Sequence, residues 1–550
     1  MPLHLDPQGY FHDGQKRIIP VGANYWPASC GVEMWVQWPA EEIRHDIATL
    51  KKLGLNCIRF FLRWQDFEPQ PGAYNDANFD KLRQVLRWCR DYGVWAHPSL
   101  FVGFMSGGLF WPKWKGDRNL YADPEVAAAS ARFARRATEV IAEFKDIVIA
   151  IDQGNELCCL KESYVAPPAA VIAWCAGVNQ AIRSVWPDAL IISGNEQNQI
   201  ANDSGWRLGQ QPGCDMYSMH TYPVAAWQPL PIDGLTDPFC QTMLPFYTQI
   251  ARAFGPVMVQ EFGTIITFSK SKQDNYLRAI LPACWNAGAN GFLWWCLRDI
   301  IAPVYPYTGH GFESTLGLID ANDRVKPGLE FFLEFATTLN TRPVAPKSQK
   351  PIGLYFPEKY YPRDTPGAYN NPTNVSKYLL VANHLLTSLG HQTRIVRGDQ
   401  PLPTDLHTLL IPSVLINSSE IPALANWVRA GGNLLWNGPD PVNWGQGYID
   451  LLGAVPLDYR RTRDAKLSLG SQDWKFGAWP RNMRVEIEPV TATIKFLDQE
   501  TQMPLILHHR YGKGQVLAAL PMVEDSIARE APLHTRWAAW YQAALALFAD

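Results

Sequence analysis

The chain has 550 residues, of which 47% are hydrophobic and 18% charged, and its formal net charge is -3. This length suffices for two to four domains, and the charge gives no reason to expect binding to nucleic acid or to an anionic membrane. No window reaches the ~18 apolar residues of a membrane-spanning helix. The N-terminal stretch lacks the basic and apolar regions of a signal peptide, so we expect a cytoplasmic protein.

Short apolar runs alternate with amphipathic stretches from residue 18 to residue 340. The predicted strands are 17–24, 55–61, 94–100, 147–151, 189–193, 215–220, 256–260 and 291–295. The predicted helices are 39–53, 79–92, 124–144, 168–186, 239–254, 273–287 and 326–339. The fifth unit has a loop at 201–213 in place of a clear helix. Eight consecutive β units predict a (β/α)8 barrel; an open doubly wound sheet is the alternative, but it rarely needs eight.

A linker is predicted at 341–350, and a second α/β pattern follows it. Its predicted strands and helices are 352–356, 375–389, 392–396, 408–412, 421–430 and 432–436. Beyond residue 450 the pattern becomes strand-like, at 465–469, 483–488, 492–496, 505–509 and 515–519, with a closing helix at 535–548. We therefore predict three domains: the barrel at 1–343, an α/β domain at 344–449 and a small β-rich domain at 450–550.

The 22 Trp and 21 Tyr residues are many for this length. A large aromatic core would explain them as well as a sugar-binding cleft, in which pyranose C–H faces stack on indole rings. The 10 Cys residues show no metal-ligand spacing, although Cys158 and Cys159 are adjacent. We expect them to be reduced and buried, and we expect neither a metal site nor a cofactor.

One carboxylate stands out at the end of the fourth predicted strand. The β-branched run Ile147–Ile151 suits a strand buried on both faces, and Gly154 is predicted to break it. Asn155 and Glu156 follow at once, at the C-terminal end of a barrel strand, where such barrels place catalytic residues. We interpret Glu156 as a proton donor.

A second carboxylate, Glu261, follows the seventh predicted strand in the same way. Two carboxylates from different strand ends are what hydrolysis of a glycosidic bond requires. One protonates the leaving oxygen, and partial desolvation together with its neighbour's charge keeps that group protonated near neutral pH. The other attacks the anomeric carbon in a retaining enzyme, which assigns Glu156 as the acid and Glu261 as the nucleophile.

Other polar and aromatic residues at the strand ends are candidates for binding the substrate. Arg59 would keep the nucleophile ionised, unless it is an ion-pair partner in the core. Glu196 follows the fifth strand in a Gly-Asn-Glu sequence like that of Glu156, and substrate binding or a structural hydrogen bond is its expected role. The remaining candidates, each weighed against plain packing, are His97, His220, Tyr222, Trp26 and Trp294, the last preferred to Trp295 because side chains alternate along a strand.

These motifs resemble the retaining (β/α)8 glycoside hydrolases of clan A, and family 5 most closely, over about residues 21–339. The residues that carry the resemblance are Gly154-Asn155-Glu156, Glu261, Ile58-Arg59-Phe60, His220-Thr221-Tyr222 and Trp294. The resemblance implies that Asn155 binds the sugar 2-hydroxyl, that Glu156 is the acid/base and that Glu261 is the nucleophile. The sequence departs from the family at His97-Pro98-Ser99, where many members have paired His or His-Asn.

Residues 408–412 and 421–436 resemble the flavodoxin-like trimerisation domain of family 42 β-galactosidases, which implies a flavodoxin-like second domain and a homotrimer. Barrels with such a domain resemble exo-acting galactosidases and mannosidases. We therefore expect a retaining exo-β-glycosidase acting on terminal sugars, with β-mannosidase as the first choice. A β-galactosidase, a β-glucosidase and an endo-β-mannanase or glucanase are the alternatives. A carbohydrate-binding barrel without activity is disfavoured because both carboxylates are present.

Overall fold

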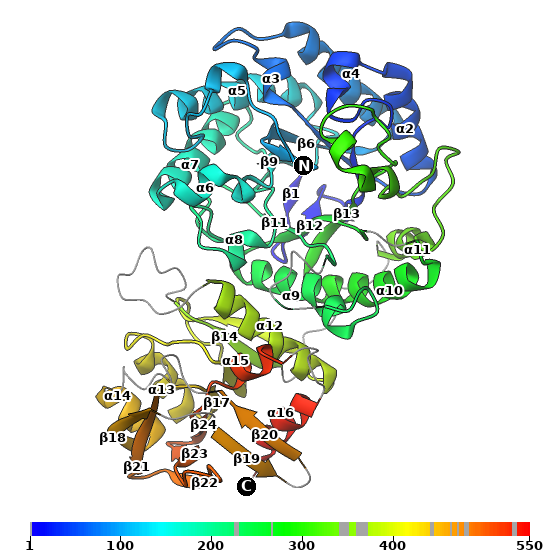
Figure 1. Ribbon diagram of the computed structural model, residues 1–550. Coiled ribbons are helices and arrows are strands. Elements are labelled where there is room, and N and C mark those ends of the chain that lie inside the picture. Colours follow the sequence, from blue (N-terminus) through cyan, green and yellow to red (C-terminus); the bar gives the residue numbers. More distant parts are fainter. Residues whose placement is uncertain are drawn as a thin grey trace. The chain divides into compact units, whose positions relative to one another are not determined.

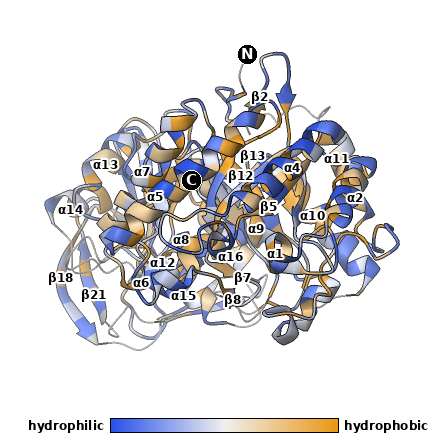
Figure 2. Ribbon diagram, turned by 90° about the horizontal axis from the view of Figure 1, so that it is seen from above, coloured by the Kyte–Doolittle hydropathy of each residue, from blue (hydrophilic) through white to orange (hydrophobic). Residues whose placement is uncertain are grey.

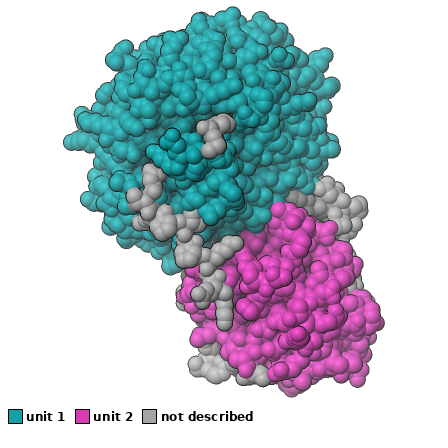
Figure 3. Space-filling view, turned by 180° about the vertical axis from the view of Figure 1, so that it is seen from behind, with its two compact units in different colours: residues 1–227, 234–345 teal, residues 228–233, 346–550 magenta. Residues whose placement is uncertain are grey.

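The computed structural model describes residues 3–224, 230, 232–265, 268–339, 351–358, 372–439, 445–461, 465–469, 472–477, 483–530 and 536–549. The chain divides into two compact units, one of residues 1–227 and 234–345 and one of residues 228–233 and 346–550 (Figure 3). The predicted linker at 341–350 lies outside the described residues. The division into three domains stays a prediction.

The first unit is a barrel, as predicted. In its described residues, eight parallel strands form one sheet in the order β10-β9-β6-β5-β4-β13-β12-β11. A further parallel bridge between Ile192 and Met216 joins the two ends of this sheet and closes the ring. The strands are β4 (Val21–Tyr25), β5 (Cys57–Phe61), β6 (Trp95–Val102), β9 (Ile151–Asn155), β10 (Ile191–Ile192), β11 (Tyr217–His220), β12 (Val257–Phe262) and β13 (Ala289–Trp294).

Helices surround this sheet on the outside (Figure 1). They are α2 (Ala40–Lys52), α4 (Asp76–Tyr92), α5 (Pro124–Ile141), α7 (Pro168–Val185), α9 (Pro238–Phe254), α10 (Lys270–Asn286) and α11 (Glu330–Leu339). Helix α5 shows why they form here: the Asp123 side chain accepts hydrogen bonds from the backbone N–H groups of Glu125 and Val126, and Pro124 suits the first turn. The fifth unit has the short α8 (Asn198–Ala201).

Two predicted strands are corrected in position. The first splits at Pro20: residues 17–18 form β3, which joins β1 (His4–Leu5) and β2 (Phe11–His12) in an antiparallel sheet, and β4 begins at Val21. The fourth begins at Ile151 rather than residue 147 and runs through Gly154. Gly154 therefore does not break the strand. It allows β6 to approach, because a Cβ at this position would lie 2.5 Å from the carbonyl oxygen of Phe101.

The second unit contains a seven-stranded sheet, within its described residues, in the order β15-β14-β16-β17-β24-β23-β22. The predicted parallel strands pair as expected, and β24 extends the parallel part before β23 and β22 run antiparallel. The sheet strands are β14 (Ile352–Phe356), β15 (Thr393–Arg397), β16 (Thr408–Ile411), β17 (Asn433–Asn437), β22 (Thr493–Leu497), β23 (Pro504–Tyr511) and β24 (Gly514–Ala519). One sheet thus takes strands from both sides of residue 450.

The remaining strands of this unit pair two by two, β18 with β21 and β19 with β20. They are β18 (Ala454–Arg461), β19 (Ala465–Leu469), β20 (Gln472–Phe476) and β21 (Met483–Pro489). The helices are α12 (Pro372–Ser388), α13 (Ile421–Arg429), α14 (Gln446–Leu452), α15 (Val523–Ala528) and α16 (Arg536–Ala546).

Hydrophilic and hydrophobic residues alternate along most helices (Figure 2), as expected for helices that bury one face. In α2, for example, Ile43, Ile47 and Leu50 are fully buried. Among the residues that the structure describes, no helix has both the length and the apolar character needed to cross a bilayer.

Candidate active site

Two carboxylates meet at the C-terminal ends of the barrel strands. Glu156 follows β9, Glu261 lies near the end of β12, and His220 ends β11. One polar side-chain atom of each of these three residues lies within 4.8 Å of the others. One oxygen of each carboxyl group therefore lies no more than 4.8 Å from the other, which is compatible with the about 5–5.5 Å of retaining glycosidases and shorter than the about 6.5–9.5 Å of inverting ones, which need room for a water molecule between the carboxyl groups.

Arg59 of β5 lies at the centre of the site and is fully buried. Its guanidinium donates to Asp152 Oδ2 through Nε at 3.1 Å and Nη2 at 2.7 Å, and to Asn155 Oδ1 through Nη2 at 3.0 Å. Its Nη1 donates to Asn24 Oδ1 at 3.0 Å and to Glu261 Oε2 at 3.3 Å. Arg59 is thus both a core ion-pair partner and a neighbour of the predicted nucleophile.

Glu261 receives hydrogen bonds on both carboxylate oxygens. Tyr222 Oη donates to Oε1 at 2.7 Å, and the guanidinium donates to Oε2. Burial raises the pKa of Glu261 to about 7, while the charge of Arg59 and the hydrogen bond from Tyr222 act to lower it. Since both donors stabilise the charged form, we assign Glu261 as the ionised member of the pair.

Glu156 stands in a sharp turn that is held by the neighbouring strand end. Its backbone has φ 49°, the left-handed region that side chains other than glycine rarely adopt, and its N–H donates to the carbonyl of Gly194 at 2.8 Å. Gly194 is itself at φ 61°, and a Cβ there would lie 1.9 Å from the carbonyl oxygen of Gly154. This turn leaves the Glu156 side chain 14% exposed, so that it can meet a ligand.

Burial raises the pKa of Glu156 to about 7, and Arg59 lowers it in part. In contrast to Glu261, Glu156 forms its close contact with a histidine, His220 Nδ1, at 2.9 Å from Oε1. Burial lowers the pKa of His220, so that this imidazole is neutral near pH 7.

A chain of hydrogen bonds fixes where the imidazole protons lie. His97 Nδ1 lies 2.8 Å from the carbonyl oxygen of Ala150 and must donate to it. Burial lowers the pKa of His97 to about 4, so that its Nε2 carries no proton and accepts from Gln260 Nε2 at 2.8 Å. Gln260 Oε1 then accepts from His220 Nε2 at 3.0 Å. The His220 Nδ1 that faces Glu156 is therefore without a proton.

An unprotonated Nδ1 can only accept a hydrogen bond, so Glu156 must donate one. A protonated Glu156 beside an ionised Glu261 satisfies the hydrogen bonds that the two carboxyl groups make with His220, Tyr222 and Arg59. The proton shared by the two carboxyl groups thus belongs on Glu156.

Gln260 enters this chain because β12 has a bulge. Along β11 and β12, Met219 pairs with Val259 but His220 pairs with Glu261, which leaves Gln260 as the extra residue. Successive side chains of a strand normally point to opposite faces, and a bulge changes this alternation. Gln260 and Glu261 therefore both reach the site.

Of the predicted site residues, the structure groups Arg59, His97, Asn155, Glu156, His220, Tyr222 and Glu261 through these contacts. Sequence reasoning missed Asp152 and Gln260, and it did not predict that Asn24 accepts a hydrogen bond from Arg59. Asp152 could have been found as a charge within a buried strand, which needs a partner. The signal for Gln260 is weak, because nothing in the sequence marks the bulge.

The three tryptophans at the strand ends, Trp26, Trp294 and Trp295, contact different aromatic rings or contact them in different orientations. Trp26 is buried and stacks on Phe61, with ring centroids 5.4 Å apart. Trp294 packs edge-on against Phe262, whereas Trp295 adjoins Phe61 edge-on at 6.0 Å. Arg59 also lies over the Phe61 ring, so that Trp295 and Arg59 contact the same aromatic side chain. The assignment of Trp294 to the substrate wall stays a prediction, and Trp295 is a second candidate.

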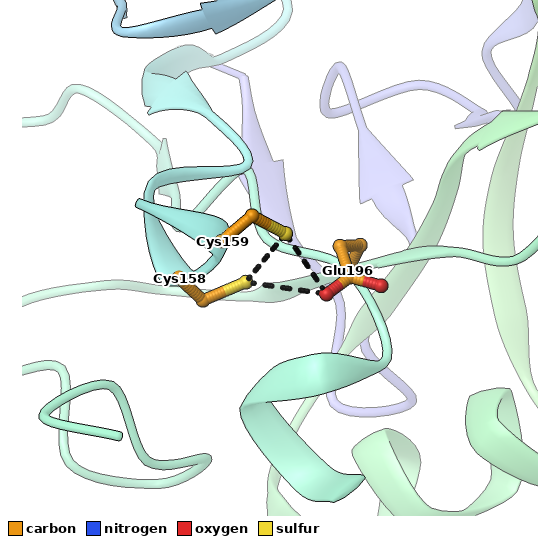
Figure 4. A group of neighbouring side chains, drawn as sticks. All are labelled: Cys158, Cys159 and Glu196. Atoms are coloured by element: carbon orange, nitrogen blue, oxygen red, sulfur yellow. Dashed lines mark hydrogen bonds between the residues drawn. The ribbon is translucent and has the colours of Figure 1, made fainter. Parts of the chain in front are cut away.

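Glu196 is separate from the hydrogen-bond network of the two carboxylates. Its Oε1 lies 3.1 Å from Cys159 Sγ and 3.6 Å from Cys158 Sγ, and it accepts from the Asn198 backbone N–H at 2.8 Å (Figure 4). Burial, and then the charge of Glu156, raise the pKa of Glu196 to about 8. Among the described residues, this cluster and the group of Glu156, His220 and Glu261 have the spacing to hold a cation. Arg59 already supplies a positive charge to the second group.

The chain matches known proteins over its barrel and beyond it. The family model described as cellulase (glycosyl hydrolase family 5) matches residues 20–299. An exo-β-1,4-mannosidase from Opitutaceae bacterium strain TAV5 is 46% identical, with a TM-score of 0.95 over 98% of this chain and 99% of that chain. GH5_18 from Streptomyces cattleya, in complex with GlcNAc, is 18% identical, with a TM-score of 0.62 over 70% of this chain and 95% of that chain. A β-galactosidase from Rahnella sp. R3 is 12% identical, with a TM-score of 0.69 over 96% of this chain and 88% of that chain. The last two share the fold.

Proposed function

This chain belongs to glycoside hydrolase family 5, and from that premise we propose that it is a retaining exo-β-1,4-mannosidase. The observation that carries the mechanism is the pair Glu156 and Glu261, with carboxylate oxygens no more than 4.8 Å apart. The sugar specificity is supported by the 46% identity, over nearly the whole chain, to an exo-β-1,4-mannosidase.

In the first step, Glu261 attacks the anomeric carbon and forms a glycosyl ester, while Glu156 gives its proton to the departing oxygen. The geometry suits these roles, because Arg59 and Tyr222 donate to Glu261 and favour its charged form. The anionic Glu156 that results lies beside His220 Nδ1, at a separation of 2.9 Å.

In the second step, Glu156 takes a proton from water, and the resulting nucleophile attacks the anomeric carbon from the side of the departed group. The ester bond to Glu261 breaks, mannose leaves with its β configuration, and both carboxyl groups return to their initial protonation. No redox or metal chemistry enters this cycle.

The other predicted residues are proposed to orient the sugar. Asn155, whose amide Nδ2 donates to the carbonyl of Phe104 and whose Oδ1 accepts from Arg59, would meet the 2-hydroxyl. His97 acts on the pair indirectly, by orienting Gln260 and through it His220. Glu196, Trp26 and Trp294 stay proposals for substrate binding.

A panel of substrates tests this function. We expect release of p-nitrophenol from the β-mannoside, little from the β-galactoside and β-glucoside, and release of mannose as the first product from β-1,4-manno-oligosaccharides. Polymeric mannan separates exo from endo action, because an endo-mannanase lowers its viscosity long before free mannose accumulates. Faster turnover of the β-galactoside than of the β-mannoside would refute the specificity, and Glu261→Gln protein is the control for contaminating activity.

We also propose that the protein is a homotrimer, from the resemblance of its second α/β part to a trimerisation domain. The likeness of fold to a β-galactosidase over 96% of this chain is consistent with this proposal. Light scattering tests it, since a mass equal to that of one 62.0 kDa chain would refute it. A cytoplasmic location remains a proposal from the sequence.

A further inference from the structure

A buried cluster of two thiols and one carboxyl group includes the two cysteines that follow Glu156 in the sequence. Cys158 and Cys159 belong to the turn η4 (Leu157–Cys159), directly after Glu156, and Glu196 follows β10. Figure 4 shows the two sulfur atoms and one oxygen of Glu196 facing one another. The proposed hydrolysis uses neither thiol.

We propose that Cys158, Cys159 and Glu196 form a binding site for a thiophilic divalent cation, of which Zn2+ is the type. The spacing of the ligand atoms carries this proposal. The two Sγ atoms are 3.9 Å apart, and Glu196 Oε1 lies 3.6 Å from one and 3.1 Å from the other.

Tetrahedral zinc requires nearly this triangle. Bond lengths of about 2.3 Å to sulfur and about 2.0–2.2 Å to oxygen give edges of about 3.8 Å between two sulfurs and about 3.6 Å between sulfur and oxygen. Two of the three observed edges match within about 0.1 Å, and the third needs an adjustment of about half an ångström. Adjacent cysteines therefore present a pair of ligands with the spacing of a metal site, rather than the about 2.05 Å of a disulfide.

The burial of Glu196 is a second and independent observation. Its exposed fraction is 8%, and among the described residues its side-chain partners are the two thiols and the Asn198 backbone N–H. A buried carboxylate ordinarily has a cationic partner or a metal. In the described part of the chain no Lys or Arg forms an ion pair with Glu196, and a bound cation would stabilise the charged form of its carboxyl group.

Binding would proceed with a balanced exchange of protons. Burial raises the pKa of the Cys158 thiol, so this thiol is protonated in the metal-free protein. On binding, Cys158, Cys159 and Glu196 each release one proton to solvent, and they form two metal–sulfur bonds and one metal–oxygen bond. Two thiolates select zinc-like ions over Mg2+ or Ca2+. Three protein ligands leave a fourth position open for water or another ligand. The Asn198 N–H on Oε1 would orient the carboxylate.

The test is metal uptake by the reduced full-length protein. We expect one Zn2+ per chain in competition with a chromophoric chelator, and with Cd2+ a thiolate-to-metal charge-transfer absorbance. The Cys158→Ser/Cys159→Ser double variant should lose both signals. Glu196→Gln should weaken binding by at least about tenfold, on the scale of losing a supporting group from a metal site. Cys214→Ala, which removes a half-buried thiol elsewhere, is the matched control and should bind as the wild type does.

Equal uptake by the double variant and the wild type would overturn the proposal. So would the absence of stoichiometric uptake by reduced wild-type protein, including the case in which the two cysteines instead form a disulfide in air. A variant could lose zinc because it misfolds, so a measurement on the wild-type protein is also needed. X-ray absorption of the wild-type zinc complex should show two sulfur neighbours at about 2.3 Å and light atoms at about 2.0 Å. A zinc shell without sulfur would refute the site.

Discussion

Replacing Gln260 by leucine tests whether the hydrogen-bond chain sets the protonation of the acid. Gln260 Oε1 accepts from His220 Nε2 and so keeps the proton away from the Nδ1 that faces Glu156. Leucine cannot accept, and His220 can then place its proton on Nδ1 and donate to an ionised Glu156. A hydrogen bond to the neutral form is exchanged for one to the charged form, which lowers the pKa of Glu156.

The size of the shift follows from one hydrogen bond. A net value of about 1–1.5 kcal/mol corresponds to about one pKa unit. The pKa of Glu156, which burial raises to about 7, would fall to about 6. At pH 7 the protonated fraction would drop from about a half to about a tenth, and kcat/KM would fall about fivefold. Below the lower pKa the two proteins should converge.

The assay is the pH profile of kcat/KM on p-nitrophenyl β-mannoside between about pH 5 and about pH 9, with a chelator present to keep the protein metal-free. The basic limb should move toward acid in Gln260→Leu. Gln153→Leu is the matched control, because Gln153 is a buried glutamine of β9 whose amide donates to Asn179. An equal loss of kcat/KM at every pH, with the basic limb unmoved, would refute the assignment of the proton.

The remaining predictions concern the two carboxylates and the turn that holds one of them. Glu261→Gln should lower kcat by at least about 10⁴-fold, since it removes the nucleophile, while a thermal melt shows the protein still folded. Glu156→Gln should lower kcat by about 10²–10⁴-fold on substrates with poor leaving groups, which need a proton from the acid. On dinitrophenyl mannosides the rate of the first step, measured as the burst of dinitrophenol, should fall far less. Equal losses of rate on both kinds of substrate would contradict the role of Glu156 as acid. Wild-type kcat/KM should fall as the pH rises above about 7, because the acid must be protonated, and should fall again in acid, because Glu261 must be ionised. Gly194→Ala should destabilise the protein by at least about 2 kcal/mol in denaturant titrations, since its φ is 61° and its Cβ would clash, whereas Gly177→Ala, in open space on α7, should be neutral or stabilising by up to about 1 kcal/mol.

Much of the barrel follows from the sequence because its strands and helices have distinct periodicities. Runs such as 55–61 and 256–260 are buried on both faces and read as parallel strands, and β5 and β12 occur there. Strand ends are less predictable. The sequence predicts that Gly154 ends β9, yet the close approach of β6 requires glycine inside the strand.

The carboxylates of the site follow from their places after strands, but their network does not. Glu156 and Glu261 are read from single motifs, whereas the link from His97 through Gln260 to His220 depends on a bulge in β12. A bulge is one extra residue in a pairing register, and register is a relation between two strands that one stretch of sequence does not encode. For the same reason, the sequence predicts only that the adjacent thiols are buried core residues, because their contact with Glu196 depends on the fold.

Arg59 has a consequence for how this enzyme can change. One guanidinium shares its donors among residues of β4, β9 and β12, so a substitution at Asn24, Asp152 or Asn155 alters the partners of the others through it. Effects of such substitutions should be strongly epistatic, with coupling energies of about 0.5–3 kcal/mol in double-mutant cycles. Substitutions that change the sugar specificity are therefore better tolerated in the loops beyond the strand ends than among the partners of Arg59.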